Sequence, residues 1–279
     1  RQTVSGSMAL GLAESNWRAT ILRGDAMILE IWGTEGTGKN YLALTAAEVR
    51  PPVTLFAFDG NEEVALKTFE RIYPELFKQV TVLRFPEVYK SVLGGINKAK
   101  ATRNFAWFGA EIDKAMTTKG TIIFDTGDQV WHLVRTVKLE GFAEGEEVAP
   151  KDHDQANSVM DGLLYNLQLG DILGIFLHKA EHPWEGGMKS GGYVQSKWVR
   201  AKTYKEFGYK MRLSVFLDKP NIFQPTEEQV KAARDRKLPL PKAVVTYRSY
   251  IYECKDNQEL NDKPITNPTV KKILGMVYP

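Results

Sequence analysis

The sequence predicts an α/β fold in which a mostly parallel sheet is flanked by helices and extended by antiparallel strands near the C-terminus. From about residue 26 to residue 178, short apolar runs typical of buried strands alternate with longer helical patterns. Parallel neighbours in a sheet need crossover connections, and this alternation supplies a helix for each crossover. The runs at 209–217 and 244–254 are rich in β-formers with no obvious helix between them, so we expect them to extend the sheet antiparallel.

Local signals along the chain define the other elements. The first strand is predicted over residues 26–33, where an apolar run ends at a glycine, and a helix over 39–50, which stops at Pro51. Asn61 can cap another helix whose first turn carries Glu62 and Glu63, the charge sign that the helix dipole favours. Further strands are expected at 53–58, 80–85, 121–125 and 172–178, and further helices at 96–119, 129–139 and 155–169.

Length, composition and charge describe an ordinary globular chain. Its 279 residues are 43% hydrophobic and 25% charged, and we expect residues 8–279 to form one domain, preceded by an expression remnant at 1–7. A net charge of +3 is too small to indicate nucleic-acid binding by itself, so such a site has to be local. The single Cys254 excludes an internal disulfide and fits a reducing cytoplasm, and no apolar run is long enough to span a membrane.

A glycine-rich segment between the first strand and the first helix fits the phosphate-loop pattern G-x-x-x-x-G-K. In such loops successive backbone N–H groups turn inward around phosphate oxygens, and the lysine reaches the β- and γ-phosphates. The segment follows a strand and opens a helix, as this mechanism requires. We therefore expect it to bind a nucleotide through Gly33, Thr34, Glu35, Gly36, Thr37, Gly38, Lys39, Asn40 and Tyr41.

The metal position of this loop departs from the usual pattern, because Asn40 stands where Ser or Thr gives a hydroxyl to Mg²⁺. An amide oxygen can substitute for the hydroxyl, but asparagine is bulkier and its carbonyl lies further out. Asp125 ends the apolar strand at 121–125, as the carboxylate of a Walker B strand does. We expect Asn40 and Asp125 to hold Mg²⁺, and nucleotide binding to survive the departure at Asn40 better than hydrolysis does.

The order and spacing of these motifs resemble those of phage-encoded RecA-like P-loop ATPases, including those associated with single-strand annealing proteins. The resemblance rests on residues 33–39, 58–64, 122–126 with Trp131 downstream, and 176–179, and it spans roughly residues 25–255. Only the phosphate loop is individually specific. The resemblance implies a RecA-type core, ATP with Mg²⁺, assembly as a homo-oligomer, and action on DNA in phage recombination or replication, in the cytoplasm of the bacterial host.

The resemblance also suggests roles for residues outside the loop. RecA-like ATPases place a catalytic glutamate after the strand that follows the phosphate-loop helix, where this chain has Asp59, Glu62 and Glu63. We favour Glu62 as the residue that orients the attacking water, although both glutamates also suit the first turn of a helix. His178 ends the strand after the Walker B strand, where a polar residue senses the γ-phosphate. A structural, hydrogen-bonded histidine is the other interpretation.

Segment 181–206 is the candidate DNA-binding loop. It is long and glycine-rich, and it interleaves cations with aromatic residues, the combination that binding of single-stranded DNA uses. The alternative is a surface excursion with its tryptophans packed inward. The acidic segment 138–154 is a poor DNA binder and is expected to face a neighbouring subunit. The candidate DNA contacts are Lys189, Tyr193, Lys197, Trp198, Arg200 and Lys202.

Two functions stay open at this point. The first is an ATP-hydrolysing RecA-like protein that binds single-stranded DNA, with Lys39, Glu62, Asp125 and His178 as its catalytic set. The second is a nucleotide-gated binding or assembly module of the loader or clamp type. In that case hydrolysis would be weak or absent, because Asn40 replaces the hydroxyl ligand of the metal.

Overall fold

The computed structural model describes residues 27–58, 60, 62–87, 96–139, 153–181, 184–187, 192–195, 200–201, 207–236, 238–241 and 244–278. The strands of its main sheet are β1 (Met27–Gly33), β2 (Val53–Ala57), β3 (Val80–Arg84), β4 (Thr121–Asp125), β5 (Leu173–Glu181), β8 (Arg200–Ala201), β9 (Leu213–Leu217), β12 (Arg248–Cys254) and β13 (Pro264–Thr266). Within the described residues the strand order is β13-β12-β9-β1-β5-β4-β2-β3, with β8 paired to β5. The predicted remnant at 1–7 and nearly all of the acidic segment 138–154 lie outside these residues.

The predicted fold class is confirmed. β1 runs parallel to both β5 and β9, and β5, β4, β2 and β3 continue the parallel sheet on one side. On the other side β12 pairs antiparallel with β9, and β13 pairs antiparallel with β12. β5 lies between the strand that leads into the phosphate loop and the strand that ends in Asp125. The carboxyl ends of these three parallel strands therefore meet at one edge of the sheet.

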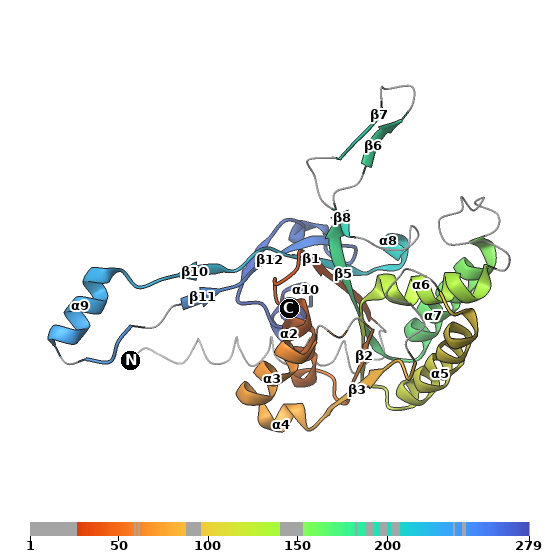
Figure 1. Cartoon of the computed structure of the whole chain (residues 1–279), viewed down its shortest axis with the longest axis horizontal. Helices are drawn as coiled ribbons and strands as arrows, with labels where there is room; N and C mark the ends of the chain where they lie inside the picture. The colour runs from red at the N-terminus through yellow and green to blue at the C-terminus, as the bar shows by residue number, and fades with distance from the viewer. Residues whose placement is uncertain are drawn as a thin grey trace, which may run out of the picture.

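Helices cover both faces of the sheet (Figure 1). One face packs against α2 (Lys39–Leu44), the 3₁₀-helix η1 (Thr45–Glu48), α3 (Glu63–Ile72), α4 (Pro74–Phe77) and α10 (Val270–Val277). The other face packs against α5 (Lys98–Thr117), α6 (Gly127–Lys138), α7 (Asp154–Leu169) and α8 (Phe207–Lys210). Alternate residues of β1 enter different cores, with Leu29 and Ile31 on the first face and Ile28 on the second. Burial on both faces explains why the strands appear in the sequence as continuous apolar runs.

A row of phenylalanines fixes the strands that carry the predicted site residues. Phe124 of β4 stacks on Phe176 of β5 with ring centroids 4.3 Å apart, and on Phe56 of β2 at 5.7 Å. Cross-strand aromatic pairs of this kind add to the stability gained by burial alone. The strands that end at Asp125 and pass through His178 are thus held in a fixed register.

The C-terminal part differs from the prediction in three ways. The run at 209–217 is not one strand, because residues 207–210 form α8 and only 213–217 form β9. β9 is parallel to β1 rather than antiparallel, since the chain crosses the sheet between β5 and β9. Helices are also present after β9: α9 (Glu227–Asp235), the 3₁₀-helix η4 (Gln258–Leu260) and α10. Within the described residues no helix is both long enough and apolar enough to cross a membrane.

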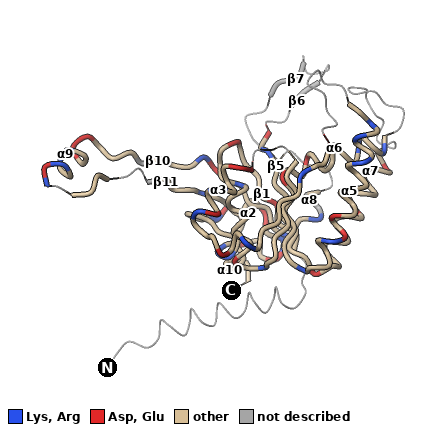
Figure 2. The backbone as a smooth tube through the Cα atoms, turned by 60° about the horizontal axis from the view of Figure 1, so that its bottom comes forward, with Lys and Arg blue, Asp and Glu red and all other residues tan. Residues whose placement is uncertain are grey.

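Two hairpins leave the main sheet. β10 (Asn221–Phe223) and β11 (Val244–Thr246) pair antiparallel and carry α9 at the end of an arm that extends away from the body in both views (Figures 1 and 2). Lys/Arg and Asp/Glu both occur along α9 (Figure 2). β6 (Trp184–Gly187) and β7 (Gly192–Gln195) form a second hairpin that projects beyond β5 and β8 (Figure 1).

Candidate functional site

The phosphate loop at 33–38 is shaped by positions that only glycine can fill. A Cβ at Gly33 would lie 2.4 Å from the backbone oxygen of Leu217, a distance that real Cβ atoms do not reach. Gly38 has φ of 88°, in the left-handed region that other residues rarely adopt. The Thr37 hydroxyl donates to the backbone oxygen of Thr34 at 2.9 Å and closes the turn. The loop is therefore held in shape by its own hydrogen bond and by its close packing against β9.

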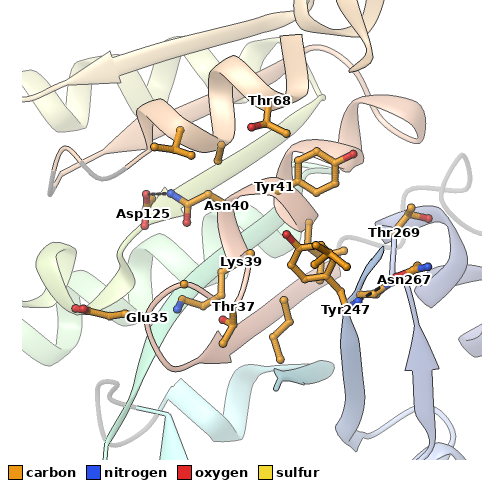
Figure 3. A pocket seen from close by; sticks show the side chains of 18 of the residues that line it. Glu35, Thr37, Lys39, Asn40, Tyr41, Thr68, Asp125, Tyr247, Asn267 and Thr269 are labelled. Carbon is orange, nitrogen blue, oxygen red and sulfur yellow. Dashed lines mark hydrogen bonds between the residues drawn. The ribbon is translucent and has the colours of Figure 1, made fainter. Parts of the chain in front are cut away.

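Lys39 lies inside this turn. It begins α2, its side chain is buried, and its Nζ donates to the backbone oxygens of Gly33 at 2.9 Å and Thr34 at 2.8 Å (Figure 3). These carbonyl contacts hold an ammonium group at the mouth of the loop. An anion entering the loop would thus meet a positive charge that is already in place.

Asn40 and Asp125 meet across the sheet edge. Asn40 Nδ2 donates to Asp125 Oδ2 at 2.6 Å, and Asp125 is almost fully buried (Figure 3). A carboxylate can only accept this bond, so the nitrogen of the amide faces Asp125 and the amide oxygen is turned elsewhere. The two residues that the sequence assigned to the metal are thus neighbours. They offer carboxylate and amide oxygens, the ligand type that Mg²⁺ prefers.

A cavity of about 760 Å³ opens next to the loop. One wall is the loop itself with Asn40 and Asp125, and a second comes from α3. A third wall, which the sequence did not predict, comes from the C-terminal strands and brings Tyr247 and Asn267 to the loop (Figure 3). The Asn267 side chain accepts the backbone N–H of Tyr247 at 3.0 Å, and Tyr247 accepts the backbone N–H of Asn267 at 2.8 Å, which fixes this wall.

Replacing Tyr247 with alanine is expected to weaken nucleotide binding by about 5- to 100-fold, because an aromatic ring stacked on a base contributes about 1–3 kcal/mol. The ring lies beside the loop, since a Cβ at Gly38 would be 3.1 Å from its Cε1, and the side chain is partly exposed to the cavity. Isothermal titration calorimetry with ATP measures the effect. Tyr247→Phe keeps the ring and should bind as wild type does, and Tyr165→Ala removes an exposed ring of α7 outside the cavity lining as a control. Equal affinity in Tyr247→Ala and wild type would contradict this role.

Two more residues at the cavity refine the sequence prediction. Tyr41, predicted to contact the nucleotide, lines the cavity, and burial together with nearby Tyr73 raises the pKa of its hydroxyl to about 12. Lys179 also lines the cavity and was not predicted; it lies opposite Gly33 in the sheet, with its Nζ 3.5 Å from Glu35 Oε1. The alternation of β5 was the available signal, because Lys179 must face away from the neighbouring His178.

Glu62 is not among the residues that line the cavity. It is fully buried as the N-cap residue of α3, and its Oε1 accepts from Arg84 Nε at 2.7 Å. Its Oε2 is buried and has no hydrogen-bond partner among the described residues. Glu63 is exposed, and its Oε2 lies 3.5 Å from Lys67 Nζ. Asp59 and Asn61, which flank this position in the sequence, lie outside the described residues.

His178 is also not among the residues that line the cavity. β5 does not end there but continues to Glu181, and His178 is 1% exposed. Its Nε2 lies 3.9 Å from Oε1 of Glu30, a buried carboxylate of β1 that the sequence analysis missed. The Ser214 hydroxyl donates to Glu30 Oε2 at 2.5 Å. A lone acidic residue in an apolar strand was the signal that could have identified Glu30.

Replacing Glu30 with glutamine should make the free energy of unfolding less sensitive to rising pH. Burial raises the pKa of Glu30 from 4.5 to about 7, partly opposed by the Ser214 hydrogen bond, and Glu253 adds to the rise. Between these values the native state binds more protons than the unfolded state, so the free energy of unfolding falls as pH increases, by about 3 kcal/mol in all. Thermal melts at pH 5 and pH 8 should show the variant gaining on wild type as pH rises. A melting-temperature difference that is the same at both pH values would contradict the expectation.

The candidate DNA contacts all belong to segment 181–206. Lys189, Lys197, Trp198 and Lys202 lie outside the described residues. Tyr193 belongs to β7, whose backbone pairs with β6. Arg200 is in β8, and its guanidinium lies 3.1 Å from Glu181 Oε1, which ties this short strand to the end of β5. No group of three or more potential metal-ligating His, Cys, Asp or Glu side chains occurs in the described part of the chain.

No protein-family model and no curated protein matches the sequence. Several solved structures are similar in general arrangement, two of which follow. The RadB recombinase has a TM-score of 0.47 and 13% identity, over 89% of this chain and 90% of that chain. A prototypical ATPase from the type III secretion system of pathogenic bacteria has a TM-score of 0.38 and 14% identity, over 79% of this chain and 58% of that chain, so this chain spans less than two thirds of its length. At these values function has to rest on the site itself.

Proposed function

We propose that the protein binds ATP with Mg²⁺ at the phosphate loop and hydrolyses it, as a RecA-like ATPase acting on single-stranded DNA in recombination or replication. One observation carries the proposal: the Lys39 ammonium, the phosphate loop and the Asn40–Asp125 pair meet at one cavity. The loop, Lys39 and Asn40 are consecutive in the sequence, whereas Asp125 comes from a separate strand, β4. The cavity can therefore bind a polyanion and a metal ion next to each other and close to a cationic side chain.

The described residues fit a nucleoside triphosphate with Mg²⁺. Lys39 and Lys179 supply positive charge at the end where the phosphates would bind, and the glycines let backbone N–H groups approach. The cavity volume of about 760 Å³ is in the usual range for small-molecule sites. Tyr247 offers an aromatic face for a base beside the loop.

In hydrolysis the protein's own residues would act mainly by positioning and by charge stabilisation. Lys39 would exchange its carbonyl partners for phosphate oxygens, and Asn40 and Asp125 would hold Mg²⁺, which when bound neutralises phosphate charge. We retain Glu62 as the residue that orients the attacking water. Its Oε2 is the oxygen without a hydrogen-bond partner in the described chain, and the carboxylate must move from beside Arg84 to reach the cavity.

The Asn40–Asp125 hydrogen bond supports hydrolysis over the nucleotide-gated alternative. A serine or threonine hydroxyl at this position can donate to the acidic residue while its lone pairs face the metal. Asn40 can divide these two tasks, since Nδ2 donates to Asp125 and the amide oxygen stays available to a cation. The substitution therefore keeps both interactions with different atoms.

Replacing Asn40 with leucine, which has a similar size and no polar atom, is expected to lower Mg²⁺-dependent turnover by about 10- to 100-fold. The change removes a hydrogen bond to a charged group, worth about 1.5–3 kcal/mol, and an oxygen ligand. Asn40→Thr restores the usual hydroxyl and should retain or raise turnover. Rates measured over a Mg²⁺ series separate the metal affinity from the maximal rate. If Asn40→Leu turned over ATP like wild type at every Mg²⁺ concentration, this role for Asn40 would be wrong.

DNA is assigned to segment 181–206 on two grounds. Its composition interleaves cations and aromatic residues, and it starts directly at the end of β5, the strand that carries His178 and Lys179. A change at the phosphate end can therefore reach the segment through one strand. The sequence resemblance is what supports a phage origin, a homo-oligomer and action in the cytoplasm of a bacterial host.

Steady-state ATP hydrolysis in Mg²⁺, measured with and without single-stranded DNA, tests the proposal. We expect turnover above a Lys39→Ala blank and a further increase with DNA. A Lys197→Ala/Trp198→Ala double variant should keep the basal rate and lose the increase. If ATP binds but no rate exceeds the blank, hydrolysis is contradicted and the nucleotide-gated module takes its place.

A further inference from the structure

Glu30 is a buried carboxylate that the proposed chemistry does not use. It lies on β1 three residues before the phosphate loop and is 5% exposed. Its Oε2 accepts from the Ser214 hydroxyl, which itself accepts from Trp32 Nε1 at 3.0 Å. Its Oε1 is buried and has no hydrogen-bond partner among the described residues. A buried carboxylate oxygen in this state is costly, so it needs an explanation.

The group that Oε1 faces is the His178 ring, at 3.9 Å from Nε2. That distance exceeds the 2.7–3.2 Å of a hydrogen bond by about 1 Å, so a small shift of the ring would form one. The ring is confined on its other sides. A Cβ on Gly127, the first residue of α6, would lie 2.4 Å from its Cε1, and the Phe207 ring packs edge-on at 4.9 Å.

These contacts place His178 at a junction of three parts of the site. Glu30 belongs to the strand that enters the phosphate loop, Gly127 lies two residues after Asp125, and Phe207 directly follows segment 202–206. A displacement of the ring would therefore change its contacts with Gly127, near Asp125, and with Phe207, where the chain returns from the candidate DNA-binding segment.

We propose that Glu30 is a positioning residue that sets the orientation and protonation of His178, and so connects the phosphate-loop strand to the strand that leads into segment 181–206. The expected effect on DNA-stimulated turnover rests on the proposed function, whereas the coupling between Glu30 and His178 does not. As a carboxylate, Glu30 accepts a hydrogen bond from a protonated Nε2 of His178. As a neutral acid, it donates a hydrogen bond to an unprotonated Nε2.

Both forms of Glu30 are accessible near neutral pH. Burial raises the pKa of the carboxyl to about 7, the Ser214 hydrogen bond opposes the rise, and the charge of Glu253 on β12 adds to it. Among the described residues the polar or titratable groups acting on Glu30 are therefore Ser214, His178 and Glu253. Ser214 and Glu253 lie outside the Glu30–His178 pair, and each can be changed with little change in side-chain size.

NMR of the histidine rings tests the coupling on the full protein. The chain has four histidines, and His178→Gln identifies the signal of interest. We expect the His178 ring shifts to follow a transition near pH 7 that Glu30→Gln removes. Ser214→Ala should move the transition to higher pH and Glu253→Gln should move it to lower pH, since these changes remove an interaction that lowers and one that raises the Glu30 pKa. His178 shifts that are unchanged by Glu30→Gln would overturn the proposal.

If Glu30→Gln does not fold, the opposite shifts in Ser214→Ala and Glu253→Gln decide the matter, and their absence counts against the proposal. On the functional side, Glu30→Gln should leave ATP affinity within about twofold and lower DNA-stimulated turnover by about tenfold. Wild-type protein that binds ATP without turnover would count against the proposed hydrolysis, while the NMR result would stand on its own.

Discussion

Replacing Lys39 with alanine is expected to lower ATP turnover by about a thousandfold or more and to weaken ATP binding strongly. The side chain is buried in the loop, and its ammonium is held 2.9 and 2.8 Å from two loop carbonyls. Removing one preorganised donor to developing charge typically costs 10²–10³ in rate, and here a full positive charge is lost as well. The carbonyls of Gly33 and Thr34 would also lose their shared donor, which loosens the loop.

The control for this change is Lys67→Ala, which removes a highly exposed lysine of α3 that lies outside the cavity lining. It should have wild-type turnover and stability. Circular dichroism and thermal melting establish that Lys39→Ala stays folded. A folded Lys39→Ala protein with more than about a tenth of wild-type turnover would contradict the role given to this loop.

Replacing Asp125 with asparagine is expected to lower turnover by about 10²–10³-fold and to abolish most of its dependence on Mg²⁺. The new side chain keeps the size and one acceptor oxygen, so it can still receive the hydrogen bond from Asn40 Nδ2. The negative charge is lost at the place where the metal would bind, and hard divalent cations depend on such charges. The change is thus an electrostatic one with little effect on packing.

Rates over a Mg²⁺ series test this expectation, with Asp113→Asn on the exposed side of α5 as the matched control. The control should follow wild type at every Mg²⁺ concentration. If Asp125→Asn showed the wild-type Mg²⁺ dependence, the carboxylate would not be a metal ligand, and the 2.6 Å bond to Asn40 would be a structural contact only.

The features that the sequence predicts well are those encoded within a few consecutive residues. The phosphate loop needs only its glycines, Lys39 and the flanking strand and helix, all of which are local. Asp125 was predictable because the end of a parallel strand faces the same sheet edge as the loop. The proximity of Asn40 to it follows from the same argument, whereas the hydrogen bond between them required the structure.

Other features depend on parts of the chain that meet only after folding. Tyr247 reaches the loop because β12 joins the sheet beside β9, which nothing near residue 247 in the sequence indicates. Arg84 pairs with the buried Glu62 carboxylate although the two are 22 residues apart. The error at 209–217 has a similar cause: Phe207 packs into the core under β5, so the chain there forms α8 before it enters the sheet.

We infer that the loop at 33–39 and the C-terminal wall together hold ATP. Equilibrium binding of ATP in Mg²⁺ to wild type and to Lys39→Ala tests it most directly, by calorimetry at the same protein concentration. We expect saturable binding to wild type with one site per chain, and a loss of about a hundredfold or more in the variant. Equal binding by the two proteins, or no binding by wild type, would contradict it.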